Sequence, residues 1–385
     1  MKFRTRAIHI GNEPDPATGA VVPPIHVAST FIQQKAGEWG QYDYSRSGSP
    51  TRNNVERTIA NLEGGAGALA FASGMAATHC AVMLLKAGDH IVAGSDIYGG
   101  TYRLLHKIAN RAGVEVTLAS ACDLQSLQTA IRPTTKMIWI ESIGNPLMSI
   151  PDVAKVAELA RSKKLLLGVD NTFATPLLVR PIELGADIVM HSATKYLSGH
   201  SDCLAGVLVA SNEALHRELY FAQNATGAVL GPFESFLLAR GLKTLELRVR
   251  EQSKSAMTIA RWLASHRHVK RVLYPGLESH PGHDIAAKQM DGAFGGMMSF
   301  EIDGDFDATK VVCQSTKLFG LAVSLGAVES LIEQPASMSH ASYDAKDKVK
   351  FGISDSLIRI SIGLEDADDL IADLDQAIAR AYISN

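Results

Sequence analysis

The residues best suited to chemistry follow a short apolar run near the middle of the chain. Residues 188–190 have the composition of a buried strand, and small and hydroxyl-bearing residues then surround one lysine, Lys195. A lysine here is either a solvated loop residue or a nucleophile, because burial lowers the pKa of an amine and makes its neutral form available. Ser192 and Thr194 precede it and carry hydroxyls that could hold an oxyanion beside the amine.

Two other predicted strands also end in polar residues. The run "LLLGV" ends at Asp170, a carboxylate that is costly inside an apolar strand unless a cation or a metal partners it. No metal is expected, because neither a second carboxylate nor a histidine cluster lies nearby in the sequence. After "ALAFA", Ser73, Gly74 and Met75 open a predicted helix. The free N–H groups of such a helix suit a phosphate, although an ordinary helix cap is the simpler explanation of these residues alone.

Tyr98 follows a further predicted strand, "DHIVAG", and is either a turn residue or an aromatic face for a ligand. Ligands of open α/β sheets bind beyond the carboxyl ends of the strands, so these residues are expected to converge. A phosphate site, an aromatic face, a carboxylate for a protonated ring nitrogen and a lysine for an aldehyde together describe pyridoxal 5'-phosphate. The sequence therefore predicts an enzyme that uses this cofactor.

Apolar runs that alternate with amphipathic segments predict the elements that carry these residues. From about residue 52 the alternation is typical of an α/β fold with a mostly parallel sheet covered by helices on both faces. After about residue 232, a long helical stretch with a possible break at Gly241 precedes shorter strands and a closing helix, which indicates a smaller α+β domain. The predicted organisation is a proline- and glycine-rich arm that contacts a neighbouring subunit (1–50), a cofactor-binding domain (51–232) and a C-terminal domain (233–385).

The composition narrows the location and the partners. The net charge of -3 disfavours nucleic acid and anionic membranes, which would select a basic face. The beginning of the chain lacks an apolar run of signal-peptide length, and no stretch approaches the roughly 20 apolar residues of a membrane span. The four scattered cysteines fit a reducing compartment, so a cytoplasmic protein is expected.

Several longer stretches resemble the trans-sulfuration family of pyridoxal-phosphate enzymes, the cystathionine lyases and synthases and methionine γ-lyase. These stretches are "YSRSGSPTR", "FASGMAA", "DIYGGTYRL", "VDNTFATP", "HSATKYLSGHSD", "SLGAVESLIEQPASMSHAS" and "LIRISIGLED". They lie within about residues 7 to 375, nearly the whole chain. The resemblance implies fold type I, a homotetramer of two dimers with shared sites, and a carbon–sulfur lyase of methionine and cysteine metabolism that acts on a small sulfur amino acid.

The resemblance also implies a role for each matching residue. Lys195 would bond to the cofactor and then transfer substrate protons, Asp170 would pair with the ring nitrogen, and Tyr98 would stack on the ring and help to deprotonate the incoming amine. The other implied contacts are Ser73 as a helix cap beside the cofactor, Gly74, Met75, Ser192 and Thr194 to its phosphate, Asn145 to its hydroxyl, Tyr44 and Arg46 to the phosphate of a neighbouring subunit, and Arg359 to the substrate carboxylate with Ser324 nearby.

Val323 bears on which reaction is catalysed. Many γ-synthases and γ-lyases that this chain resembles carry a glutamate there, which could meet the distal ammonium of cystathionine. An apolar residue resembles plant-type cystathionine β-lyases and methionine γ-lyases, but the latter typically carry a cysteine where this chain has Gly100. Cystathionine β-elimination, which yields homocysteine, pyruvate and ammonia, is therefore expected. The alternatives are a γ-lyase or γ-synthase, an aminotransferase on the same fold, and an inactive regulatory protein that binds pyridoxal phosphate.

Overall fold

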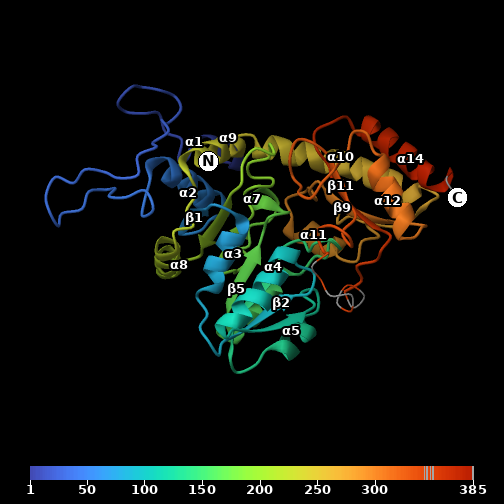
Figure 1. Ribbon diagram of the computed structural model, residues 1–385, viewed down its shortest axis with the longest axis horizontal. Helices are drawn as coiled ribbons and strands as arrows, with labels where there is room; N and C mark the ends of the chain where they lie inside the picture. Colours follow the sequence, from blue (N-terminus) through green and yellow to red (C-terminus); the bar gives the residue numbers. More distant parts are fainter. Residues whose placement is uncertain (342, 344–345, 347, 349–350, 384–385) are drawn as a thin grey trace.

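Two β-sheets organise the chain in the computed structural model, which describes residues 1–341, 343, 346, 348 and 351–383 (Figure 1). The strands of the larger sheet lie in the order β1-β7-β6-β5-β4-β2-β3, and those of the smaller sheet in the order β10-β11-β12-β9-β8. The larger sheet consists of β1 (Gly67–Phe71), β2 (His90–Gly94), β3 (Glu115–Ala119), β4 (Thr135–Glu141), β5 (Leu166–Asp170), β6 (Ile188–His191) and β7 (Gly206–Ala210). The smaller sheet consists of β8 (Val269–Leu273), β9 (Met297–Ile302), β10 (Gly320–Leu321), β11 (Leu331–Glu333) and β12 (Leu357–Ser361).

Helices cover both sheets. Those before the end of β7 are α1 (Phe3–His9), α2 (Pro50–Glu63), α3 (Gly74–Val82), α4 (Gly99–Arg103), the π-helical η1 (Leu104–Ala109), the 3-10 turn η2 (Asn110–Ala112), α5 (Leu124–Ala130), α6 (Val153–Ser162) and α7 (Thr175–Leu178). Those after it are α8 (Glu213–Thr226), α9 (Pro232–Leu242), α10 (Leu245–Ser265), α11 (His283–Gln289), α12 (Phe306–Ser315) and α14 (Ala367–Ile383). Within the described residues, none of these helices has both the length and the apolar character needed to cross a membrane.

The larger sheet is mostly parallel, as the sequence predicts. Strands β3, β2, β4, β5 and β6 run parallel, whereas β7 is antiparallel to both of its neighbours, β6 and β1. The chain from β6 to β7 consists of turns and contains no helix. Because a parallel return needs a long crossover connection, usually a helix, this short connection brings β7 back antiparallel. The smaller sheet is antiparallel except for the pair β10 and β11.

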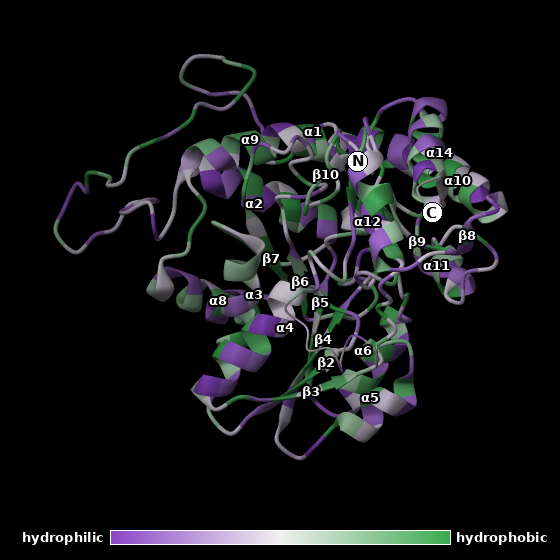
Figure 2. Ribbon diagram, turned by 45° about the vertical axis from the view of Figure 1, so that its right-hand side comes forward, coloured by the Kyte–Doolittle hydropathy of each residue, from purple (hydrophilic) through white to green (hydrophobic). Residues whose placement is uncertain are grey.

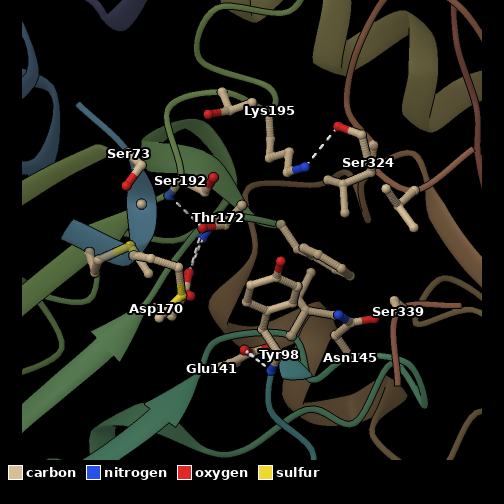
Figure 3. A pocket seen from close by; sticks show the side chains of 18 of the residues that line it. Ser73, Tyr98, Glu141, Asn145, Asp170, Thr172, Ser192, Lys195, Ser324 and Ser339 are labelled. Carbon is tan, nitrogen blue, oxygen red and sulfur yellow. Dashed lines mark hydrogen bonds between the residues drawn. The ribbon is translucent and has the colours of Figure 1, made fainter. Parts of the chain in front are cut away.

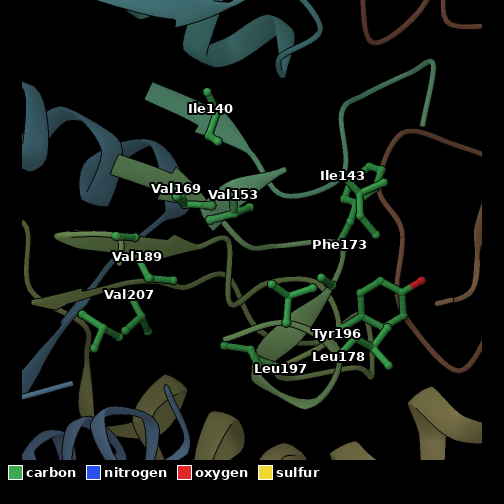
Figure 4. Packing of buried hydrophobic residues seen from close by; sticks show 14 of the residues in the cluster. Ile140, Ile143, Val153, Val169, Phe173, Leu178, Val189, Tyr196, Leu197 and Val207 are labelled. Carbon is green, nitrogen blue, oxygen red and sulfur yellow. The ribbon is translucent and has the colours of Figure 1, made fainter. Parts of the chain in front are cut away.

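Both faces of the larger sheet are buried, which explains why its strands read as continuous apolar runs. Ile140, Val169 and Val189 pack into one hydrophobic cluster (Figure 4), and the sequence neighbours Trp139 and Met190 pack into a second cluster on the other face. Successive side chains of a strand point to opposite faces, so each strand needs apolar residues at every position. The strands accordingly stand out as hydrophobic in the middle of the molecule (Figure 2).

The predicted long helix after residue 232 is two helices, α9 and α10, which are separated at residues 243–244. Gly241 was predicted as a possible break, but it lies inside α9. A Cβ at this position would lie 2.3 Å from the carbonyl oxygen of Ser198, in the loop that follows Lys195. The glycine therefore allows the helix to approach that loop closely.

The N-terminal arm is less irregular than the sequence predicts, because α1 folds at its start and contacts α2 and α10. Most of the chain between α1 and α2 extends away from the rest of the molecule (Figure 1). Its apolar side chains include Ile32, which is 99% exposed, and Trp39, which is 74% exposed. The contact of this arm with a neighbouring subunit, and the domain boundaries expected at residues 50 and 232, stay predictions.

A substitution at Gly168 tests the packing between β4 and β5. It lies opposite Trp139, and a Cβ at this position would lie 2.4 Å from the indole ring. We expect Gly168→Ala to lower the free energy of unfolding by about 1–3 kcal/mol, because the ring must shift within a close-packed core. Urea unfolding followed by circular dichroism measures the loss. The double variant Gly168→Ala/Trp139→Leu should lose less than the sum of the single losses, and additive losses would contradict the proposed clash.

Candidate active site

A cavity of about 350 Å³ opens at the carboxyl ends of the strands of the larger sheet. It is also lined by residues that come from beside and within the smaller sheet (Figure 3). Of the fourteen site residues that the sequence predicts, twelve line this cavity, namely Ser73, Gly74, Met75, Tyr98, Asn145, Asp170, Ser192, Thr194, Lys195, Val323, Ser324 and Arg359. Tyr44 and Arg46 lie on the arm and do not line it. Residues more than 280 positions apart in the chain therefore meet at one place.

The beginning of α3 forms one wall of the cavity. Ser73 caps this helix, because its hydroxyl accepts a hydrogen bond from the N–H of Ala76 at 3.1 Å. The N–H groups of Gly74 and Met75, in the first turn, have no carbonyl partner within the helix. A Cβ on Gly74 would lie 2.9 Å from Cβ of Ser192, so only glycine lets the two segments approach this closely. This helix end suits an anion such as a phosphate.

The two hydroxyl residues before Lys195 differ in their bonding. Thr194 Oγ1 donates to the carbonyl oxygen of Ala205 at 3.1 Å and accepts from the N–H of the same residue at 3.0 Å. The hydroxyl of Ser192 forms no hydrogen bond with any residue that the structure describes, whereas its backbone N–H donates to Thr172 Oγ1. Ser192 therefore has the freer hydroxyl for a phosphate, and Thr194 also braces the loop that carries Lys195.

Asp170 ends β5 inside the cavity and is only 6% exposed. Its Oδ1 accepts two hydrogen bonds from Thr172, one from the N–H at 3.0 Å and one from the hydroxyl at 2.5 Å. Burial raises the pKa of Asp170, and the hydrogen bonds from Thr172 and the charge of His191 oppose that rise. The described residues donate only to Oδ1, which leaves Oδ2 for a cationic ligand group such as a protonated ring nitrogen.

Lys195 lies in the loop after β6, and its Nζ donates to Ser324 Oγ at 2.7 Å. Burial, together with the positive charge of Arg359, lowers the pKa of Lys195 to about 8. A substantial fraction of neutral amine is therefore present near neutral pH, as a nucleophile requires. Ser324 has a positive φ of 115°, a strained conformation for a residue with a side chain.

Arg359 is held by three groups around the cavity. Its Nη1 donates to Asn145 Oδ1 at 2.8 Å and lies 3.1 Å from Glu333 Oε1, and its Nη2 donates to the carbonyl oxygen of Ser324 at 3.1 Å. Arg359 and Glu333 are register partners on β12 and β11, and both are almost fully buried. Sequence reasoning missed Glu333, because the three-residue strand β11 that carries it was not among the predicted strands.

Glu141 is a second buried carboxylate that sequence reasoning missed. It ends β4, is the register partner of Asp170, and accepts a hydrogen bond from the N–H of Tyr98 at 2.7 Å. Burial, and then the negative charge of Asp170, raise the pKa of Glu141 well above its usual value. Tyr98 is 43% exposed with its ring at the cavity, so Glu141 fixes the backbone that carries an accessible aromatic face. The signal was available, because "WIES" places an acid at the end of a predicted strand.

The arm and the rim of the cavity carry three further residues of interest. Arg46 Nε donates to Asn224 Oδ1 at 3.2 Å, and the Arg46 guanidinium lies 5.4 Å from the ring centre of Tyr44. Arg103 is an exposed residue that lines the cavity, and no carboxylate of the described chain forms an ion pair with it. Sequence analysis did not single out Arg103. It places a second positive charge at the rim.

The arrangement fits pyridoxal phosphate without change. A helix end and a free hydroxyl suit the phosphate, the free oxygen of Asp170 suits a protonated ring nitrogen, and Lys195 suits an aldehyde. Within the described residues, no group of three or more histidines, cysteines, aspartates and glutamates could hold a metal ion.

Comparison with known proteins agrees with this geometry. Residues 4–379 match the family model of Cys/Met metabolism PLP-dependent enzymes. The chain is 50% identical over 376 residues to a cystathionine beta-lyase of Coxiella burnetii, covering 97% of both chains. It is also 50% identical over 376 residues to a cystathionine gamma-synthase of Mycobacterium tuberculosis, covering 97% of this chain and 96% of that protein.

A solved structure extends the comparison to the fold. The structure of a cystathionine gamma-lyase from Lactobacillus plantarum, complexed with L-serine, superposes with a TM-score of 0.96. The two chains are 45% identical in sequence, and the match covers 99% of this chain and 100% of the chain from Lactobacillus plantarum. The chain belongs to the family of Cys/Met metabolism PLP-dependent enzymes, and its cofactor is pyridoxal 5'-phosphate.

Proposed function

We propose that this enzyme cleaves cystathionine by β-elimination and releases homocysteine, pyruvate and ammonia. The observation that carries this proposal is Val323, which is 58% exposed and lines the cavity beside Ser324. An apolar side chain offers no charge to the distal ammonium of cystathionine, unlike the glutamate that many γ-enzymes resembling this chain carry there. The relative from Coxiella burnetii, which is named a cystathionine beta-lyase, supports the same activity.

The larger sheet supplies the cofactor machinery of the proposed reaction. When bound, pyridoxal phosphate supplies an aldehyde that bonds to an amine and a protonated ring that accepts electrons from a neighbouring bond. The beginning of α3 and Ser192 would bind its phosphate, Oδ2 of Asp170 would hold the proton on its ring nitrogen, and Tyr98 would cover its ring. Asn145 would lie beside its hydroxyl. Each of these groups borders the cavity already described.

Lys195 performs the proton transfers. With a pKa of about 8, its Nζ is partly neutral at physiological pH and can take the proton from Cα of the substrate. The hydroxyl oxygen of Ser324 accepts a hydrogen bond from this nitrogen at 2.7 Å and so fixes its position in the cavity. Lys195 then carries a proton that it can return to the product, so one residue acts as base and acid.

Arg359 orients the substrate by binding its α-carboxylate. Its guanidinium is anchored by Glu333, Asn145 and the carbonyl of Ser324, and it retains further N–H groups because it has five donors in total. A planar guanidinium matches a carboxylate in two parallel hydrogen bonds, which fixes the orientation of the Cα–H bond. Arg103 at the rim is placed to meet a second negative group of the substrate.

A γ-reaction on the same substrate class is the second candidate. The relative from Mycobacterium tuberculosis, which is named a cystathionine gamma-synthase, is as identical to this chain as the β-lyase relative. γ-Elimination or γ-replacement would use the same lysine for a second proton transfer, at Cβ. The cofactor machinery serves both reactions, so the choice depends on the groups around the distal part of the substrate.

The proposal includes a cytoplasmic homotetramer of two dimers. Tyr44 and Arg46 would reach the phosphate of the neighbouring subunit, and the extended arm with its exposed Ile32 and Trp39 supports such a contact. Arg46 is already oriented by Asn224. All four cysteines are free, as is usual for proteins of a reducing compartment.

Product analysis tests the reaction. Incubation with cystathionine is expected to yield pyruvate and homocysteine, because the Cβ–S bond breaks, and both products are measurable by mass spectrometry. Lys195→Ala should abolish product formation, since no other amine lines the cavity among the described residues. 2-Oxobutyrate and cysteine would instead establish the γ-reaction, and full activity of Lys195→Ala would refute the assigned proton transfers.

The lowered pKa of Lys195 predicts a pH dependence of cofactor uptake. Only the neutral amine attacks the aldehyde, so the uptake rate of cofactor-free protein should rise with pH and level off above about 8. Below that value it should fall about tenfold per pH unit. Stopped-flow absorbance measures the rate. Arg359→Met removes a nearby positive charge and should move the midpoint upward. A wild-type midpoint near 10, unchanged in the variant, would contradict this prediction.

Subunit complementation tests the shared site. Lys195→Ala and Arg46→Ala should each be nearly inactive, but refolding them together should restore about a quarter of wild-type activity, because hybrid dimers contain one intact site. A mixture of Lys195→Ala with Asp170→Asn is the matched control, since both residues line the cavity of the same subunit. Equal activity of the two mixtures would rule out a site completed by the arm.

A further inference from the structure

A buried polar cluster lies directly behind the strand ends that carry the cofactor residues. Glu63 at the end of α2, Asn171 after β5 and His191 at the end of β6 are all fully buried. Glu63 Oε1 accepts a hydrogen bond from Asn171 Nδ2 at 3.0 Å and shares a second hydrogen bond with His191 Nε2 at 2.5 Å. Their sequence neighbours Asp170 and Met190 line the cavity, whereas Asn171 and His191 do not. The cluster therefore lies beneath the floor of the site.

The geometry favours an ionised Glu63. Its Oε1 accepts from Nδ2 of Asn171 and lies 2.5 Å from Nε2 of His191, and because an imidazole is ordinarily more basic than a carboxylate, the proton of this short contact belongs on His191. With a neutral His191, the carboxylates of Glu63 and Asp170 would both be buried without a cation from the described chain, since Glu63 pairs with no cationic group other than His191 there. An uncompensated charge in a buried position is costly, and an imidazolium at His191 removes that cost.

We propose that Glu63 and His191 form a buried ion pair whose imidazolium keeps Asp170 ionised, so that the proton shared with the cofactor stays on the ring nitrogen. His191 is then a positioning residue that acts through Asp170. This inference rests on the proposed role of Asp170. It adds a chain of charged groups, called the relay below, that runs from Glu63 on α2 through His191 on β6 to Asp170.

Two observations support the relay. The positive charge of His191 contributes to lowering the pKa of Asp170 against the effect of burial. The cluster also leaves three polar atoms without a hydrogen-bond partner among the described residues, namely Glu63 Oε2, Asn171 Oδ1 and His191 Nδ1. Such atoms cost stability when buried, and an imidazolium adds to that cost, because its N–H at Nδ1 has no acceptor among the described residues. Proteins retain that kind of cost mainly at functional sites.

The direction of the electrostatic effect follows from position. Asp170 pairs with Met190 in the sheet, so His191, the next residue, points to the opposite face and does not line the cavity. Asp170 therefore stands between His191 and a ligand in the cavity. The charge of His191 thus stabilises ionised Asp170 more than it opposes a protonated ring. Removal of this charge should move the shared proton from the ring nitrogen toward Asp170.

Nitrogen-15 NMR of the holoenzyme tests the proposal. Protein reconstituted with pyridoxal phosphate labelled at the ring nitrogen should give a protonated signal, and Asp170→Asn should move it to the unprotonated position. Glu63→Gln and His191→Gln preserve size and hydrogen-bonding capacity but remove the ion pair. Both should move the signal part of the way toward that of Asp170→Asn. His90→Gln is the matched control, because His90 is equally buried at the opposite end of the same sheet, and it should leave the signal unchanged.

Nitrogen-15 labelling of the histidines in the wild-type protein provides a second NMR measurement. This measurement does not depend on whether a variant folds and binds the cofactor. Both ring nitrogens of His191 should be protonated at neutral pH. A single protonated nitrogen would overturn the proposal, as would a wild-type ring signal in both glutamine variants when Asp170→Asn does move it. If Asp170→Asn itself leaves the ring protonated, the role of Asp170 in the proposed function fails, and the relay fails with it. If neither glutamine variant folds, the His191 signals of the wild type decide the question.

Discussion

Glu141, Asp170, Lys195 and Arg359 are buried or half-buried side chains that meet at the cavity, and the charge on each depends on its neighbours. Glu141 and Asp170 end neighbouring parallel strands, so each ionised carboxylate opposes ionisation of the other in a low-dielectric site. Arg359 similarly opposes protonation of Lys195. Burial acts in the same direction in both cases, since it favours the neutral forms of carboxyl groups and amines. The outcome is that Lys195 has an available lone pair beside Arg359, which stays positively charged. A nucleophilic amine needs the lone pair, and an amino-acid substrate offers a carboxylate that the cation can bind.

A second layer of residues holds these charges in place. Thr172 bonds to Asp170, Ser324 to Lys195, and the backbone of Tyr98 to Glu141. The layer draws on both sheets, because Ser324 precedes β11 while the others follow strands of the larger sheet. A site built in this way depends on the relative placement of the two sheets, because a shift between them would change the contact of Lys195 with Ser324 and that of Arg359 with Asn145.

The two sheets also divide the work. The larger one carries the residues suited to the cofactor, whereas Val323 and Arg359 belong to the part of the chain that forms the smaller sheet. Under the proposed role of Val323, reaction type can change around the distal end of the substrate while the cofactor site is retained. Relatives named for β-elimination and for γ-replacement stand at the same identity to this chain, as expected if few residues separate the reactions.

The sequence alone determined most elements of the larger sheet and pointed to the cofactor, although it did not predict α1 or correctly place the division between α9 and α10. Apolar runs that end in Asp170 and Lys195 predict a sheet covered on both faces, and convergence of strand ends is a general property of parallel sheets, so these residues could be placed together without coordinates. Such local patterns do not predict which residue lies next to a buried charge in the folded chain. Glu333 opposite Arg359, Glu141 opposite Asp170, and Glu63 against His191 depend on strand register and helix packing, which bring together residues up to 128 positions apart. Only the tertiary structure decided these pairings, because the contribution of a buried charge depends on its neighbours in space.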